Sequence, residues 1–146
     1  MNKCTLIVLF GLFLATIALG QNDSIKITNQ PGALIEFKES SIDLGAITFD
    51  SLRKAPLVFE FTNIGNEPLI ISHLPSSGFF DWVMPYYTHE PIMPGQKSTI
   101  VLKHWLPRYG PFNKSFTVIS NAKNGDVICK VKGNILRVFN PKLSED

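Results

Sequence analysis

Cysteine is scarce in this 146-residue chain, and its placement excludes a fold stabilised by disulfides. One of the two cysteines, Cys4, lies in the apolar N-terminal stretch, so Cys129 is the only thiol in the rest of the chain. A single thiol cannot form an internal disulfide, and stability must then come from a hydrophobic core. The alternation of apolar and polar residues from Val127 to Val131 predicts that Cys129 is a small buried hydrophobic residue rather than a nucleophile or metal ligand.

The chain also lacks an excess of charge of either sign. It has 14 basic and 12 acidic side chains, and removal of Lys3 with the N-terminal stretch leaves 13 against 12. Neither a cluster of lysines and arginines nor a glycine-rich phosphate loop is present in the sequence. Such a mixed charged surface predicts little attraction to nucleic acid or to anionic lipid.

Sequence patterns of catalytic centres are missing as well. There is no Gly-x-Ser-x-Gly motif, which would place a nucleophilic serine on a sharp turn. Acidic residues such as Asp43, Glu60 and Asp81 are scattered among separate segments, so no carboxylate pair for glycoside hydrolysis is indicated. We therefore expect no enzymatic activity and no cofactor.

The three histidines, His73, His89 and His104, do not form a metal-binding motif. No two of them have the i, i+4 spacing of a helix or the i, i+2 spacing of a strand that ligands commonly use, and no metal site is indicated. The alternative is a small exported metal-handling protein. In that case histidines distant in sequence would converge on copper or zinc together with Met84 or Met93.

Residues 1–20 are typical of a cleaved export signal. Lys3 gives a short positive region, Thr5–Leu19 is uncharged and almost wholly apolar, and Ala18 and Gly20 are small residues where a signal peptidase reads the chain. Cleavage before Gln21 would leave a chain without a membrane span in the periplasm, at the cell surface or outside the cell. The rival interpretation is a retained membrane anchor, which needs an apolar run of about 18 residues or more.

The remainder is expected to form one domain. Residues 21–32 are polar and rich in turn formers and are interpreted as a leader, residues 33–136 carry strand patterns, and residues 137–146 form a short tail. A chain of this length can bury about two thirds of its unfolded surface in one core. We expect a monomer.

Alternating apolar and polar residues predict an all-β domain. Short runs with a period of two recur between turn residues, and no stretch shows a sustained helical period. Asn124–Gly125 is a strong hairpin sequence before the last run. The predicted strands are residues 34–37, 41–47, 57–62, 69–74, 98–105, 115–120 and 127–131. About seven short strands favour an immunoglobulin-like β-sandwich, although the Cys…Trp…Cys spacing of antibody domains is absent.

The same alternation predicts which side chains share the core of this sandwich. They are Leu57, Phe59, Phe61, Ile100, Leu102, Phe116, Val118, Val127 and Val131.

Four short motifs follow one another in the order and spacing of a known bacterial family. They are Asp43–Ile47, Asn63–Leu69, Pro91–Gly95 and the stretch 110–121, which opens with Gly-Pro-Phe-Asn-Lys and ends with Ser-Asn. Over most of residues 35–133 the chain resembles the exported domain-of-unknown-function family 1573 (DUF1573), an immunoglobulin-like group. The resemblance implies the fold and an exported location, and this family has no assigned activity.

The chain differs from that family after the second motif. Members commonly carry Ser-Cys-Gly-Cys-Thr, whereas this chain has Ser-Ser-Gly-Phe-Phe at residues 76–80. A thiol, metal or redox role of the cysteine pair is therefore not implied here. An aromatic segment, Phe79–Tyr87, takes its place and is predicted to be a loop.

Two interpretations of this aromatic segment remain open. Its side chains either plug one end of the sandwich or form an exposed patch that binds a partner. The candidate partner-binding residues are Phe80, Asp81, Trp82, Tyr86, Tyr87 and His89. The sequence thus predicts an exported, non-catalytic module that has a structural role or binds a protein or glycan.

Overall fold

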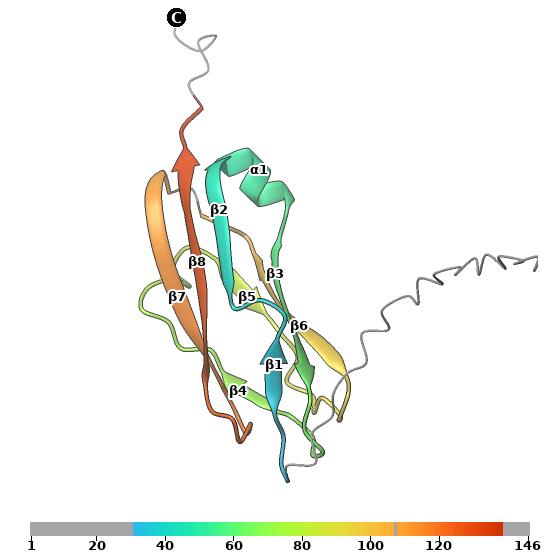
Figure 1. Ribbon diagram of the computed structural model, residues 1–146. Helices are drawn as coiled ribbons and strands as arrows, with labels where there is room; N and C mark the ends of the chain where they lie inside the picture. Colours follow the sequence, from blue (N-terminus) through green and yellow to red (C-terminus); the bar gives the residue numbers. More distant parts are fainter. Residues whose placement is uncertain (1–30, 107, 139–146) are drawn as a thin grey trace, which may run out of the picture.

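The structure is a computed structural model that describes residues 31–106 and 108–138. Two β-sheets pack face to face, as Figure 1 shows. The predicted export signal, residues 1–20, lies outside the described residues, as do most of the predicted leader and residues 139–146 of the predicted tail.

Each sheet has four strands. The first has the order β1–β3–β6–β5 and consists of β1 (Ile35–Phe37), β3 (Leu57–Asn63), β6 (Lys97–Lys103) and β5 (Met84–Tyr86). The second has the order β2–β8–β7–β4 and consists of β2 (Ser41–Thr48), β8 (Val127–Leu136), β7 (Gly110–Ser120) and β4 (Ile71–His73). All neighbouring strands are antiparallel except β2 and β8, which are parallel. The predicted immunoglobulin-like sandwich is confirmed.

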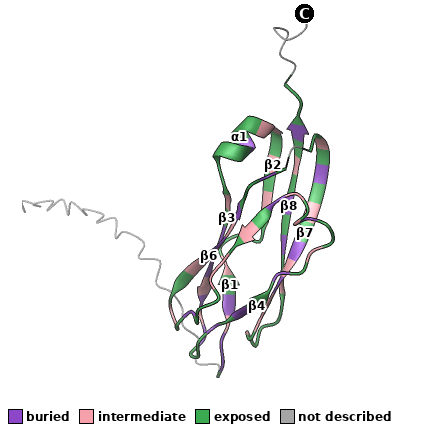
Figure 2. Cartoon of the chain, turned by 180° about the vertical axis from the view of Figure 1, so that it is seen from behind, coloured by how far each residue is buried: buried purple, intermediate pink, exposed green. Residues whose placement is uncertain are grey.

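The core lies between the sheets because each strand turns alternate side chains inward. In β3, Phe59 and Phe61 are buried while Val58 and Glu60 face solvent, and Figure 2 shows such alternation along the strands. Phe59 meets Phe116 of β7 edge to face, with 5.4 Å between the ring centres, so an aromatic contact joins the two sheets. The predicted core is confirmed for the buried residues Phe59, Phe61, Ile100, Leu102, Phe116, Val118 and Val131, while Leu57 and Val127 pack half-buried at its edge.

Cys129 lies on the inner face of β8 and is completely buried. Burial raises the pKa of its thiol from 9.0 to about 12, because the core cannot solvate a thiolate. The prediction that Cys129 is a small buried hydrophobic residue is confirmed.

The test uses a chain that begins at Gln21 and therefore lacks Cys4. In the folded chain at pH 8, we expect Cys129 to react with a thiol-specific disulfide reagent at least about a hundredfold more slowly than in 6 M guanidinium chloride. The raised pKa leaves little thiolate, and the core excludes the reagent. Stopped-flow absorbance measures both rates. Equal rates in the two conditions would show that the inner face of β8 is open.

Two of the sequence motifs are explained by local backbone geometry. In the first, the Gly45 N–H donates to the Asp43 carboxylate over 2.9 Å, and the β2–β8 register shifts between Asp43 and Ala46. Gly45 has a φ of 57°, which favours glycine at this bulge. The Gly45 N–H, and after it the ammonium group of Lys132 at 3.0 Å, lower the pKa of Asp43.

The second motif begins with Asn63, which is fully buried at the end of β3. Its side-chain amide donates to the carbonyls of Glu67 and Ile92, each over 2.8 Å. Its oxygen accepts the Gly65 N–H at 3.0 Å and the Leu34 N–H at 3.5 Å. One side chain therefore joins the start of β1 to two connecting segments, β3–β4 and β5–β6, at this end of the sandwich.

Two elements are absent from the sequence prediction. The first is α1 (Phe49–Lys54), a short helix between the strands predicted at residues 41–47 and 57–62. Thr48 caps it by accepting the Ser51 N–H, and Leu52 is the residue it buries. Because α1 links β2 of one sheet to β3 of the other, it covers that end of the sandwich (Figure 1). Six residues are too few to show a helical period.

The second missing element is β5, which lies inside the segment predicted as a loop. The other strands differ from the prediction in their ends. Strand β7 begins at Gly110 and β8 runs to Leu136, whereas the strand predicted to reach residue 105 ends at Lys103. It ends there because His104 has a φ of 56°, a left-handed conformation that cannot continue a strand. The hairpin predicted at Asn124–Gly125 is confirmed, since it connects β7 to β8.

Within residues 31–106 and 108–138, no helix is both long and apolar enough to cross a membrane.

Candidate functional site

The aromatic segment Phe79–Tyr87 begins as a plug. Phe79 is completely buried and stacks on Phe116, with 6.2 Å between the ring centres, and it meets Trp105 at 5.9 Å. Phe80 lies half-buried against Phe116, with 5.5 Å between ring centres. Val83 is buried as well. The first half of the segment therefore fills the space between the sheets, as one of the two interpretations predicted.

Trp82 lies at the border between this plug and the surface. Its indole is half-buried against Phe112, with 6.1 Å between the ring centres. Two cations lie over the ring, Arg108 at 5.2 Å and Lys114 at 5.0 Å from its centre. The exposed side of the Trp82 ring is thus occupied by cationic side chains of its own domain.

The other candidate residues also divide between half-buried and exposed positions. Tyr87 is half-buried against the core, and Asp81 and His89 are exposed, with the His89 ring 4.6 Å from that of Tyr87. Tyr86 is 43% exposed. It lies in edge strand β5, so the prediction of a loop is wrong for residues 84–86, where hydrogen bonds to β6 fix the backbone. The structure therefore does not bring the six candidates together in one exposed patch.

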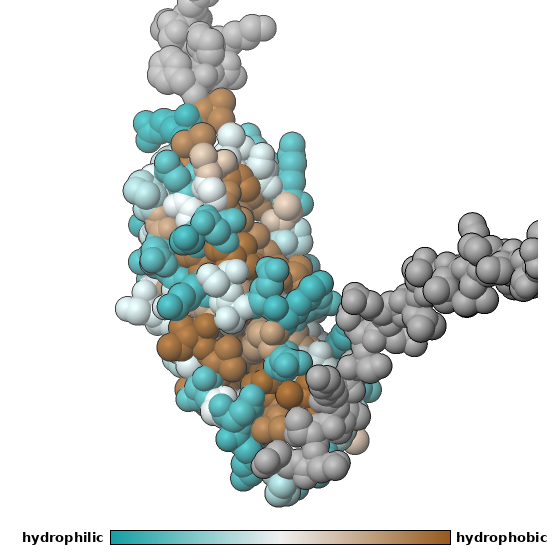
Figure 3. Space-filling view, viewed as in Figure 1, coloured by the Kyte–Doolittle hydropathy of each residue, from teal (hydrophilic) through white to brown (hydrophobic). Residues whose placement is uncertain are grey.

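Strand register places Tyr86 in a partly exposed apolar row that the sequence analysis did not find. Tyr86 of β5 pairs with Val101 of β6, which pairs with Val58 of β3. All three point away from the core, and Val58 is 46% exposed. We name these three residues the outer row. Apolar residues also lie elsewhere on the surface, since hydrophobic areas alternate with hydrophilic ones over the face in Figure 3. The outer row differs because strand register aligns its three side chains across three neighbouring strands.

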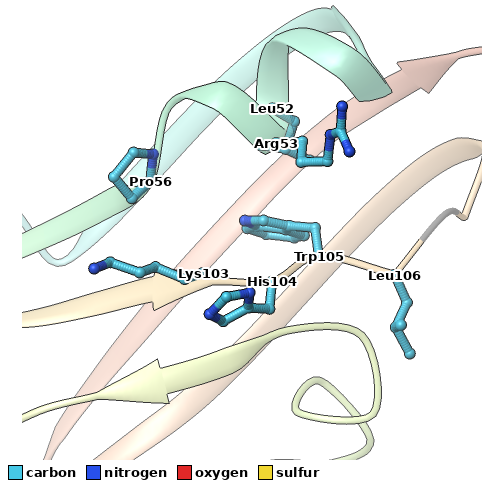
Figure 4. A pocket seen from close by; sticks show the side chains of 7 residues that line it. All are labelled: Leu52, Arg53, Pro56, Lys103, His104, Trp105 and Leu106. Atoms are coloured by element: carbon cyan, nitrogen blue, oxygen red, sulfur yellow. The ribbon is translucent and has the colours of Figure 1, made fainter.

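A groove lies beside the outer row, between α1 and the end of β6 (Figure 4). Its volume is about 560 Å³. It is lined by Leu52, Arg53, Pro56, Lys103, His104, Trp105 and Leu106. Sequence reasoning missed it because one wall is the unpredicted helix and the other is the turn that ends β6.

Aromatic contacts connect the groove to the outer row. The Lys103 ammonium lies 5.6 Å from the centre of the Tyr86 ring, and the His104 ring lies 5.7 Å from it. Tyr86 is thus shared between the row and the rim of the groove. It is the one predicted candidate that contacts both.

The predicted alternative of a metal site has no support in the described part of the chain. No group of three or more histidine, cysteine, aspartate or glutamate side chains is placed there to hold a metal ion. His73, His89 and His104 lie on β4, before β6 and after β6 respectively, and all three are exposed.

A family model described as "Protein of unknown function (DUF1573)" matches residues 35–135, which span all eight strands. Comparison with curated proteins finds no match.

Solved structures share the fold at low sequence identity. A protein of unknown function from Porphyromonas gingivalis W83 is similar with a TM-score of 0.53 and 15% identity, over 77% of this chain and 51% of that one. The VesB protease of Vibrio cholerae is similar with a TM-score of 0.54 and 14% identity, over 75% of this chain and 33% of that one. This chain therefore spans about half and a third of those proteins.

A third similar structure is the ASH/PapD-like domain 7 of human CEP192. It has a TM-score of 0.48 and 14% identity, over 88% of this chain and 99% of that one.

Proposed function

From the premise that the chain belongs to the DUF1573 family of proteins of unknown function, we propose that it is an exported, non-catalytic immunoglobulin-like module that binds a protein or glycan partner. The contact surface in this proposal is the outer row, Tyr86, Val101 and Val58, with Lys103 at its rim. The sandwich itself serves as a rigid support for that surface.

The observation that carries the proposal is the alignment of the outer row by strand register. Tyr86 and Val58 remain about half exposed although they are large and apolar. Tyrosine is enriched in binding hot spots because its ring offers contact area and its hydroxyl a polar tip. The side chains of the outer row supply contact area for a partner. The proposal assigns no catalytic step to them.

Exchanging Tyr86 for alanine together with Val58→Ser should reduce partner capture in a crosslinking pull-down from the native envelope by at least about tenfold, as loss of a hot spot does. Melting should change by only a few degrees, because surface substitutions have small effects on stability. The matched control is Ile128→Ser, an apolar residue 55% exposed on the other sheet. Unchanged capture by the double variant would contradict the proposal, and so would equal loss in the control.

A further inference from the structure

The groove between α1 and β6 has a lining that is apolar and positively charged. Apolar walls come from Leu52, Pro56 and Leu106, and positive charge comes from Arg53 and Lys103. No aspartate or glutamate lines it. Lining groups of this kind complement a ligand that joins an anionic head to an apolar body.

The groove also contains an unpaired donor. Trp105 is 5% exposed, and its indole Nε1 has no hydrogen-bond partner in the described structure. In Figure 4 this nitrogen lies at the end of the ring that faces the space between Pro56 and the side chains of Lys103 and His104. Buried N–H groups almost always have an acceptor, so this one marks a position where an acceptor would be stabilised.

Access to that donor requires a side chain to move. Less than 1 Å² of the nitrogen is open to solvent. Lys103 is an exposed long side chain at the same end of the groove as this nitrogen in Figure 4, so a movement of Lys103 is the one that would open it. The Lys103 ammonium would stay close to an entering anion, because the two opposite charges attract each other.

The backbone at the end of β6 positions the polar end of the groove. His104 has a φ of 56°, which is uncommon for a residue other than glycine and places Lys103 and His104 both on the exposed side while Trp105 turns inward. Strained backbone of this kind is concentrated at binding sites. Tyr86 packs against both exposed side chains.

We propose that the groove binds a small organic carboxylate with an apolar body. The carboxylate lies between Lys103, His104 and the Trp105 indole N–H, and the apolar body lies against Leu52 and Leu106. A volume of about 560 Å³ is within the usual range of small-ligand pockets. Arg53, which Figure 4 shows at the other end of the Trp105 ring, adds positive potential at the mouth. This ligand site adjoins the partner contact of the outer row, and Lys103 lies at the edge of both.

The test uses 1-naphthoate and its uncharged counterpart 1-naphthalenemethanol on the ¹⁵N-labelled chain from Gln21. Saturable binding of the carboxylate should shift the indole N–H resonance of Trp105 and leave that of Trp82 in place. The alcohol should bind at least about tenfold more weakly because it lacks the charge. Equal affinity of the two compounds, or no shift at Trp105, would overturn the proposal. Inorganic phosphate that binds as tightly as 1-naphthoate would also overturn it, since the apolar body would then contribute nothing.

Substitutions of groove residues test whether 1-naphthoate binds at this site. Lys103→Gln and Arg53→Gln should each weaken 1-naphthoate binding about three- to tenfold, with the larger loss at Lys103. Lys130→Gln, at an exposed residue of β8 on the other sheet, should not change it. Leu106→Ser tests the apolar wall at a residue that is 51% exposed, so the fold should persist. A dispersed amide spectrum verifies folding of each variant. Unchanged affinity in Lys103→Gln and Leu106→Ser would place the ligand elsewhere.

Discussion

Replacing Asn63 with alanine should lower the free energy of unfolding by about 3 to 5 kcal/mol, a large loss for a small polar side chain. The substitution removes the donors to the carbonyls of Glu67 and Ile92 and the acceptor for Gly65 and Leu34, although the Ile92 carbonyl keeps the Leu69 N–H at 2.9 Å. Each buried group left without a partner costs about 1 to 3 kcal/mol. Denaturant titration followed by tryptophan fluorescence measures the change.

Two further variants separate hydrogen bonding from loss of size. Asn63→Asp keeps the shape and the acceptor but loses both donors, so it should destabilise the domain nearly as much as alanine. Asn113→Ala, at an exposed position of β7, should stay within about 0.5 kcal/mol. A loss below 1 kcal/mol for Asn63→Ala would show that these connecting segments do not depend on its side chain.

Truncating Phe116 to alanine should cost about 3 to 5 kcal/mol, as the removal of large core side chains does. Its ring is 1% exposed and contacts Phe59 of the opposite sheet as well as Phe79 and Phe80 of the plug. The variant therefore loses contact between the sheets and support for the aromatic segment together. We expect weaker near-ultraviolet circular dichroism besides the lower unfolding midpoint, because fewer aromatic rings are held in fixed positions.

The control for this variant is its neighbour in the same strand. Ser115 points outward from β7 and is exposed, so Ser115→Ala should leave stability within about 0.5 kcal/mol. Similar losses at the two positions would mean that the inner and outer faces of β7 are assigned wrongly.

The sequence was sufficient for most of the sandwich because alternation is a local property. The alternation from Phe59 to Phe61 predicts which face of the strand is buried, whichever strand pairs with it. The structure confirms this prediction. Elements that depend on tertiary context were missed. The six residues of α1 show no period, and β5 is a strand only because three residues pair with β6.

The candidate site was harder to predict for the same reason. Composition drew attention to the aromatic segment, but it could not distinguish Phe79, which is buried, from Tyr86, which is exposed. Exposure there depends on strand register. The groove depends on a turn at His104 whose backbone conformation no pattern of side chains indicated.

The parallel pairing of β2 with β8 has a consequence for the order of folding. Ser41 of β2 lies beside Lys130 of β8. The second strand of the chain can therefore pair with its neighbour only after the last strand has been made. Pairing between such distant segments is slow, since a long loop must close before any contact forms. A nascent chain that has not yet released Val127–Leu136 presents β2 and β7 as open edges, the form in which strands of separate molecules pair with one another. Closure of the β7–β8 hairpin, which brings β8 beside both strands, ends that exposed interval.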